Sequence, residues 1–140
     1  MPSQPATVPQ PRNPVALIVD DASGMRAYLR AVLTAAGFDC VEAGDGAEGF
    51  GVILSGGVDL VLTDLDMPVM DGFQLISALS LLPPSFGRPP IVVISGLLTE
   101  TAAPLRPELR LAAALLAKPV QPADLLKAIG RAMGISVTAN

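Results

Sequence analysis

The sequence contains no histidine, no tryptophan and a single cysteine, and only 4% of its residues are aromatic. Without histidine, the chain has no histidine base, no histidine metal ligand and no phosphohistidine of its own. The single Cys40 excludes an internal disulfide framework and is typical of a reducing compartment, so we expect a cytoplasmic protein.

Basic patches and long hydrophobic runs are also missing. The formal charge is −4, and no cluster of Lys and Arg stands out, which argues against nucleic-acid binding. No apolar stretch is long enough to span a membrane, and the N-terminus lacks the basic start and apolar segment of a secretory signal. The chain instead has 51% hydrophobic residues in a length of 140, which is enough for one domain with a real core.

The first fourteen residues differ in composition from the rest because they include five prolines and little apolar content. We therefore expect a flexible arm over residues 1–14, one folded domain over 15–133 and a short tail over 134–140. The free arm and short tail favour a whole, stand-alone single-domain protein.

Short apolar runs alternate with segments of helical periodicity from Val15 onward. We expect strands over residues 15–20, 39–43, 58–64, 91–95 and 115–118, and helices over 23–37, 45–57, 72–83 and 122–133. Ser23 is the predicted N-cap of the first helix, Gly37 its stop, and Pro122 lies in the first turn of the last one. Continuous apolar strands that alternate with helices predict an α/β fold with a parallel sheet and helices on both faces.

Polar residues follow four of these apolar runs. The breaks are Asp20-Asp21, Asp64, Ser95-Gly96 and Lys118-Pro119. In open parallel sheets, sites lie outside the carboxyl ends of the strands, so these side chains are expected to converge at one edge.

Clustered carboxylates repel one another, and a divalent cation relieves that repulsion. An all-oxygen ligand set suits Mg²⁺. Lys118 adds a positive charge and Ser95 a hydroxyl, and together with a metal they can hold a phosphoryl group on an aspartate nucleophile.

These residues carry a resemblance to the receiver domains of two-component response regulators, from position 15 to about 133. The matching pieces are Asp20-Asp21, LTAAGFDCVEAGDG (33–46), DLDMPVMDG (64–72), Ser95-Gly96 and Lys118-Pro119. The resemblance implies a flavodoxin-like, doubly wound, five-stranded parallel sheet in the order 2-1-3-4-5.

The resemblance also implies a role for each site residue. Asp64 would accept phosphate from the phosphohistidine of a sensor histidine kinase or a histidine phosphotransfer protein. Asp21 would bind Mg²⁺ directly, Asp20 mostly through water, and Asp66 through its backbone carbonyl.

Two further roles concern the phosphoryl group, since Ser95 would bind one of its oxygens and Lys118 another. Phosphorylation would then switch contacts with an unidentified output protein, as expected for a phosphoacceptor signalling protein rather than an enzyme.

The segment between residues 97 and 117 departs from the family pattern. Pro104 and Pro107 stand where the family usually has its fourth helix, so we expect that helix to be short, shifted toward residues 107–113, or replaced by a loop. Leu115 occupies the position at which the family often has an aromatic switch residue, so coupling between that residue and the hydroxyl of Ser95 is absent or different.

Other interpretations remain open at this stage. Asp20 and Asp21 could simply cap the first helix, and Asp71 is interpreted as structural. Asp64-Leu65-Asp66 resembles the nucleophile motif of haloacid-dehalogenase-type phosphatases, although here the acid pair precedes it and no cap domain fits. A degenerate receiver that binds a partner without phosphate is a third possibility.

Overall fold

The structure is a computed structural model that describes residues 12–98 and 106–137. Five parallel strands form one sheet in the order β2-β1-β3-β4-β5. The strands are β1 (Val15–Val19), β2 (Asp39–Ala43), β3 (Leu60–Thr63), β4 (Ile91–Ser95) and β5 (Ala114–Ala117). The predicted fold class and strand order are therefore confirmed.

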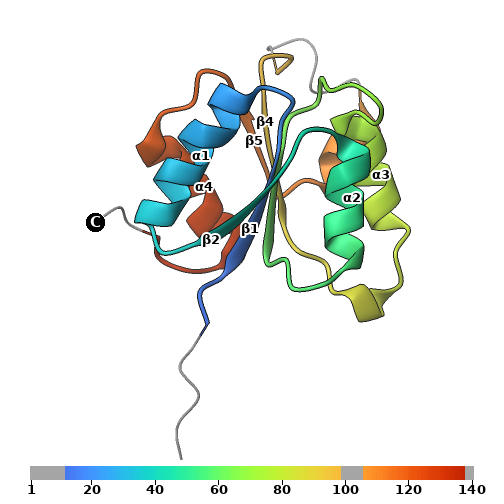
Figure 1. Ribbon diagram of the computed structural model, residues 1–140, viewed down its shortest axis with the longest axis horizontal. Coiled ribbons are helices and arrows are strands. Elements are labelled where there is room, and N and C mark those ends of the chain that lie inside the picture. The colour runs from blue at the N-terminus through green and yellow to red at the C-terminus, as the bar shows by residue number, and fades with distance from the viewer. Residues whose placement is uncertain (1–11, 99–105, 138–140) are drawn as a thin grey trace, which may run out of the picture.

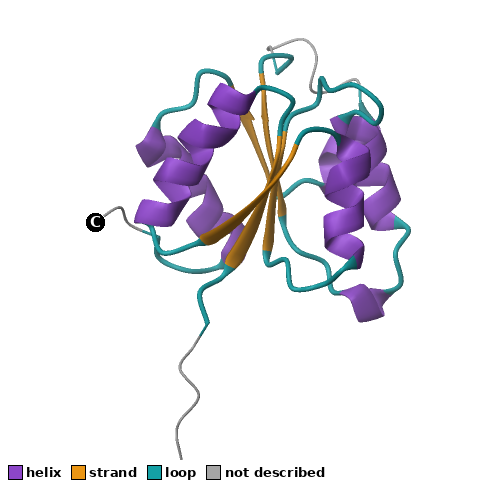
Figure 2. Cartoon of the chain, viewed as in Figure 1, coloured by secondary structure: helices purple, strands orange, loops and turns teal. Residues whose placement is uncertain are grey.

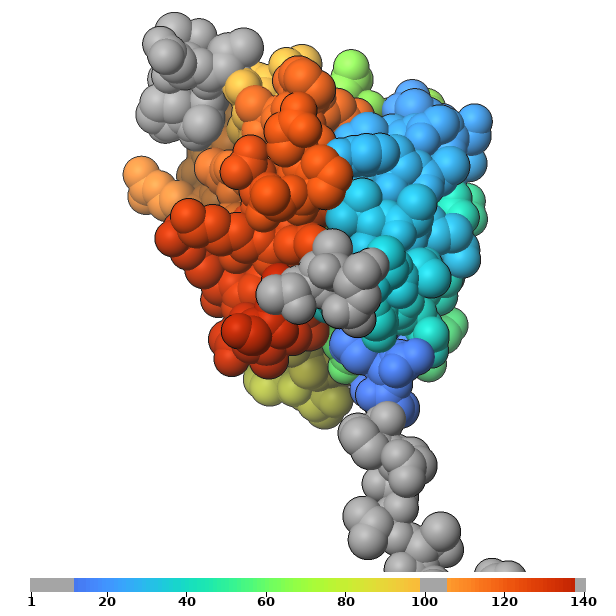
Figure 3. Space-filling model, turned by 90° about the vertical axis from the view of Figure 1, so that its left-hand side faces the viewer, coloured from blue at the N-terminus to red at the C-terminus, as the bar shows by residue number. Residues whose placement is uncertain are grey.

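Helices cover both faces of the sheet (Figures 1 and 2). They are α1 (Ser23–Ala35), α2 (Gly46–Leu54), α3 (Gly72–Ser80) and α4 (Pro122–Met133), with short 3-10 helices η1 (Pro84–Phe86) and η3 (Pro107–Leu111). Helices α1 and α4 lie side by side on one face (Figure 3), and α2 and α3 lie on the other. Within the described residues, no helix is both long and apolar enough to cross a membrane.

The two helical layers explain why the strands are apolar without alternation. In β1, Leu17 and Val19 pack into the core on the α2 and α3 side, whereas Ala16 and Ile18 pack into the core on the α1 and α4 side. All four are almost completely buried. A strand that is covered on both faces needs apolar side chains at every position.

The structure corrects the predicted start of the first helix. Ser23 is already the first helical residue and Ala22 is the N-cap, without a side-chain cap hydrogen bond. The hydroxyl of Ser23 thus lies one residue too late to cap the first turn. Gly37 follows the helix with a φ of 94°, a conformation that favours glycine and ends the helix as predicted.

The connection between β4 and β5 is irregular, as predicted. Leu98 and Arg106 are not helical, and η3 begins at Pro107 and ends at Leu111. Pro104 lies outside the described residues. The five-residue 3-10 helix η3 lies within the predicted range 107–113. Pro107 stands at its start, because proline fits the first turn of a helix but not its interior.

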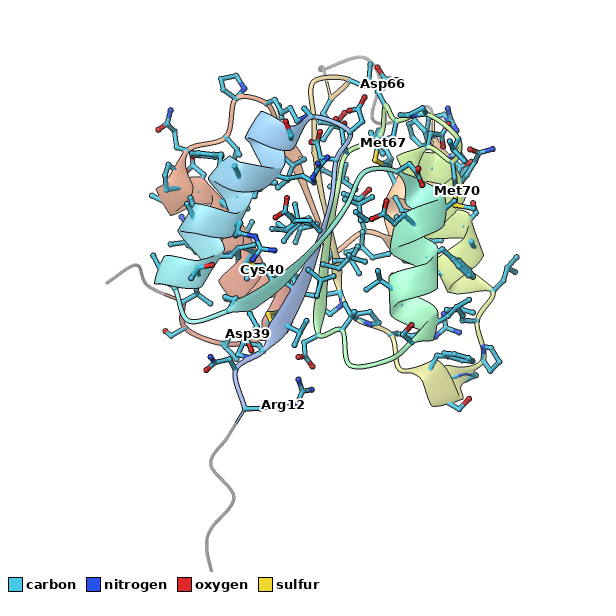
Figure 4. The ribbon with its side chains drawn as sticks, in the orientation of Figure 1. Arg12, Asp39, Cys40, Asp66, Met67 and Met70 are labelled. Atoms are coloured by element: carbon cyan, nitrogen blue, oxygen red, sulfur yellow. The ribbon has the colours of Figure 1, made fainter. Side chains whose placement is uncertain are left out.

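Residues 12–14 contact the amino edge of the sheet (Figure 4). The guanidinium of Arg12 donates two hydrogen bonds of 3.0 Å to Asp59, and the amide side chain of Asn13 lies 3.3 Å from Asp39. Residues 1–11 lie outside the described part of the chain, so the flexible arm stays a prediction.

Candidate functional site at the carboxyl edge of the sheet

Three carboxylates meet where β1 and β3 end. Since these strands are neighbours, the residues that follow them, Asp20 and Asp64, stand side by side, and the amide of Asp64 donates to the carbonyl of Val19 at 3.0 Å. Asp20, Asp21 and Asp64 each place one carboxylate oxygen within 4.8 Å of the other two. Asp20 and Asp64 are 2% and 6% exposed, while Asp21 is open to solvent. The predicted convergence of the acids is confirmed.

Lys118 supplies the positive charge between two of these acids. Its Nζ lies 2.7 Å from Oδ2 of Asp64 and 2.9 Å from Oδ2 of Asp20. Lys118 follows β5, which is two strands away from β3, so roughly 10 Å separates the backbones that carry Lys118 and Asp64. A long lysine side chain and the shorter aspartate side chain together bridge that distance, and they meet at 2.7 Å.

The pKa values of the ion pair move apart. Burial alone would raise the pKa of Asp64, but hydrogen bonds from Lys118, Ser95 and the amide of Leu65 outweigh it and hold this pKa below its usual range. Burial would lower the pKa of Lys118, but its contacts with Asp64 and Asp20 raise it above the usual value. Asp64 is therefore an ionised carboxylate, the protonation state of a nucleophile, at neutral pH.

Ser95 is completely buried at the end of β4, between the strands that carry the acid and the lysine. Its hydroxyl oxygen accepts a hydrogen bond of 3.2 Å from the amide of Leu97, and its carbonyl accepts one of 3.1 Å from the amide of Lys118. A side chain at Gly96 would meet open space, so the approach to Asp64 and Ser95 is not blocked there.

The turn from residue 64 to residue 72, called here the β3–α3 turn, aims the carboxylate of Asp64. Oδ1 accepts hydrogen bonds from the amides of Leu65 at 2.6 Å and Asp66 at 3.3 Å. The hydroxyl of Thr63, which the sequence did not single out, donates to the carbonyl of Asp64 at 2.8 Å. The carboxylate is thus fixed by its own backbone on one side and by Lys118 on the other.

Gly72 closes this turn by letting α3 begin against the backbone of Asp64. A Cβ at Gly72 would overlap the carbonyl oxygen of Asp64 and lie 2.7 Å from Cα of Leu65. Asp71 caps α3 in a capping box with Gln74, which confirms its structural role. The β3–α3 turn is therefore fixed by close packing of its backbone.

Asp66 lies at the tip of the turn and Met67 points inward (Figure 4). The side chain of Asp66 is exposed, and its predicted contribution, a backbone carbonyl ligand, stays a prediction. Leu115 lies beside Val93 in the sheet and is 40% exposed, so no aromatic ring occupies that position.

The donor set fits a hard divalent cation. Asp20, Asp21 and Asp64 offer carboxylate oxygens, and the exposure of Asp21 leaves room for the several waters that Mg²⁺ retains. Soft metals would require thiolates, which these residues do not supply.

Comparisons with known proteins agree on one family. The model of the "Response regulator receiver domain" matches residues 16–130. The transcriptional regulatory protein GlrR of Escherichia coli is 36% identical over 124 residues, 88% of this chain and 27% of that protein. The autoinducer 1 sensor kinase/phosphatase LuxN of Vibrio harveyi is 36% identical over 85 residues, 61% of this chain and 10% of LuxN. The chain thus spans only a small part of the length of these relatives.

Solved structures share the fold over nearly their whole length. The chemotaxis protein CheY4 of Vibrio cholerae has a TM-score of 0.76 and 28% identity, covering 86% of this chain and 98% of CheY4. A putative response regulator from Chloroflexus aurantiacus has a TM-score of 0.79 and 25% identity, covering 88% of this chain and 99% of that one.

Proposed function

The chain belongs to the receiver domain family of response regulators, and on this premise we propose that it accepts a phosphoryl group on Asp64 from a partner's phosphohistidine. One observation carries the proposal: the buried carboxylate of Asp64 lies 2.7 Å from Nζ of Lys118 and is flanked by two further carboxylates. A structural ion pair alone does not require two more acids within 4.8 Å.

In the proposed transfer, a carboxylate oxygen of Asp64 forms a bond to phosphorus while the bond between phosphorus and the imidazole nitrogen breaks. The electron pair of that bond stays on the imidazole, and an acyl phosphate forms. Lys118 stabilises negative charge on one phosphoryl oxygen and the hydroxyl of Ser95 donates to another. The chain has no histidine, so the phosphohistidine belongs to a sensor histidine kinase or a histidine phosphotransfer protein.

Asp20, Asp21, Asp64 and the carbonyl of Asp66 would hold Mg²⁺. When bound, the ion neutralises charge on the transferring phosphoryl group. Without the ion, the protein's own groups hold the site in place. Lys118 offsets the repulsion between Asp20 and Asp64, while the amides of Leu65 and Asp66 orient the carboxylate of Asp64.

Phosphorylation would act as a local charge event at the carboxyl edge of the sheet and change contacts with an output protein. The chain is proposed to work as a signalling switch, at most with slow self-dephosphorylation, in the reducing cytoplasm that its single cysteine fits.

The proposal is tested by the intact mass of the full chain after incubation with acetyl phosphate and Mg²⁺. We expect one added phosphoryl group, absent when Mg²⁺ is chelated and absent in Asp64→Asn. The matched control is Asp124→Asn, which removes an exposed acid on α4 and should be phosphorylated like the unmodified chain.

The other outcomes point to the alternatives. A chain that gains no mass with any small donor and binds no Mg²⁺ is a phosphate-independent binding module. Sustained hydrolysis of phosphate esters that depends on Asp64 would identify an aspartate-nucleophile phosphatase instead.

A further inference from the structure

Arg26 links the acid pair, Asp20 and Asp21, to helix α1 and strand β2. It lies in the first turns of α1, and its Nη1 donates a hydrogen bond of 2.6 Å to the backbone carbonyl of Asp20. Its Nε lies 3.1 Å from Oε1 of Glu42, on the neighbouring strand β2. One guanidinium therefore connects α1, β2 and the turn that follows β1, which a planar group with several donors can do.

Arg30, one helical turn later, provides a natural comparison. It also pairs with Glu42, at 2.7 Å, but its other hydrogen bond goes to the carbonyl of Cys40. The two arginines thus share the same carboxylate and the same helix face, and differ in whether they contact the acid pair.

The contact with Arg26 matters because little else fixes Asp21. Oδ1 of Asp20 accepts from the amide of Ala22 at 2.9 Å, and Oδ2 accepts from Lys118. Among the described residues, no hydrogen bond to the side chain of Asp21 is found. The position of Asp21 therefore depends on its backbone, and the peptide carbonyl that precedes it, that of Asp20, is held by Arg26.

We propose that Arg26 is a positioning residue for the acid pair and that it raises the affinity of the site for a divalent cation. The inference rests on the proposed function for the use of that cation. Simple electrostatics predicts the opposite, since a guanidinium beside three carboxylates should disfavour another cation and its removal should tighten binding. The sign of the change therefore distinguishes positioning from charge.

The experiment is a titration of the full chain with Mg²⁺, followed by the amide resonances of residues 20–22 in two-dimensional NMR spectra. Arg26→Met should raise the dissociation constant roughly tenfold, as loss of an outer partner of metal ligands usually does. It should also broaden or shift the resonances of residues 20–22 in the metal-free chain. Arg30→Met, the matched control, should leave the dissociation constant within about twofold.

An unchanged or tighter dissociation constant in Arg26→Met, or an equal weakening in Arg30→Met, overturns the inference. If Arg26→Met does not fold, Glu42→Gln keeps the charge of Arg26 but weakens its anchor, and it should weaken Mg²⁺ binding without removing a ligand. An unchanged constant there overturns the inference as well.

The titration needs no phosphoryl transfer, so the two proposals fail separately. A chain that is phosphorylated normally while Arg26→Met binds Mg²⁺ like the unmodified chain loses only the positioning role. A chain that shows the Arg26 effect but accepts no phosphoryl group loses only the proposed function.

Discussion

Two connections of the sheet contrast in how tightly the structure holds them. In the β3–α3 turn, backbone groups touch directly, and Gly72 leaves no space for a side chain beside Asp64. The connection between β4 and β5 (residues 96–113) has a single short 3-10 helix in its described part, and Arg106 anchors it by lying 3.5 Å over the ring of Phe73 on α3.

The two connections differ because only the β3–α3 turn contains predicted site residues. The β3–α3 turn begins with the proposed nucleophile, whose direction changes with every shift of its own backbone. The β4–β5 connection has its predicted site residues, Ser95 and Lys118, outside its two ends, where the strands hold them. Its middle is therefore free to depart from the family pattern, with Pro104 and Pro107 as the visible result.

The largest expected effect is in the β3–α3 turn. Gly72→Ala places a Cβ against the carbonyl of Asp64, and neither partner is a flexible side chain that can move away. We expect the free energy of unfolding to fall by about 3 kcal/mol, measured by chemical denaturation.

Gly51→Ala is the matched control for that change. Gly51 lies on the exposed face of α2, where a Cβ meets nothing within 4 Å, so alanine should raise the free energy of unfolding by roughly 0.5–1 kcal/mol. Equal changes in the free energy of unfolding for the two substitutions would show that the backbone contacts at Gly72 do not stabilise the β3–α3 turn.

Lys118→Met tests the charges that the turn presents. It leaves Asp20 and Asp64 buried without their counter-charge, so we expect the free energy of unfolding at pH 7 without metal to fall by about 3 kcal/mol. Lys127→Met, which removes an exposed lysine of α4, should change it little. A loss of stability in Lys118→Met no larger than in Lys127→Met would show that the pair does not stabilise the fold.

The difference between Lys118→Met and the unmodified chain should depend on pH. The pKa of Asp64 is lowered in the folded chain, so its contribution to stability is present above the unfolded pKa and is lost as pH falls through the folded pKa. The pKa of Lys118 is raised by the same contacts with Asp64 and Asp20, so at the alkaline end this shared contribution is lost as pH rises through that pKa. The free energies of unfolding of the two chains should therefore converge as the solution is acidified. A difference that stays constant from pH 7 to strong acid would show that the ion pair of Asp64 and Lys118 does not cause it.

The smallest expected effect concerns the β4–β5 connection. Arg106→Ala should lower the free energy of unfolding by about 0.5–1 kcal/mol, since the side chain is exposed and its main contact is a cation–π interaction. A double-mutant cycle with Phe73→Leu measures that interaction, and Arg110→Ala on η3 is the control. A coupling energy near zero would show that the contact between Arg106 and Phe73 does not hold the β4–β5 connection against α3.

Local patterns in the sequence predicted the elements well because their causes are local. The helix expected over residues 23–37 is present as α1, with Leu29 and Leu33 in the core, and Pro122 begins α4 as expected. Helix ends were less accurate: the predicted helix over residues 45–57 is α2 (Gly46–Leu54), and Ser23 is not an N-cap. A helix end depends on which neighbouring groups satisfy its backbone, and several residues nearby could do so.

Close packing between distant segments was beyond sequence patterns. A Cβ at Gly49 would lie 2.9 Å from the side chain of Val19, so glycine lets α2 approach β1. Arg26 gave no signal of its own, because an arginine on an amphipathic helix is ordinary until Asp20 and Glu42 are seen beside it.

The sequence by itself determined the alternation of strands and helices, the edge at which the acids gather and the identity of the candidate residues. Only the tertiary structure decided that one lysine contacts two carboxylates, from residues 98 and 54 positions away along the chain, and that Arg26 contacts both Glu42 and the backbone carbonyl of Asp20. Periodicity and capping depend on residues that are close together in the sequence. The contacts of Lys118 and Arg26, by contrast, exist only once the strand order has brought distant segments within a few ångströms of one another.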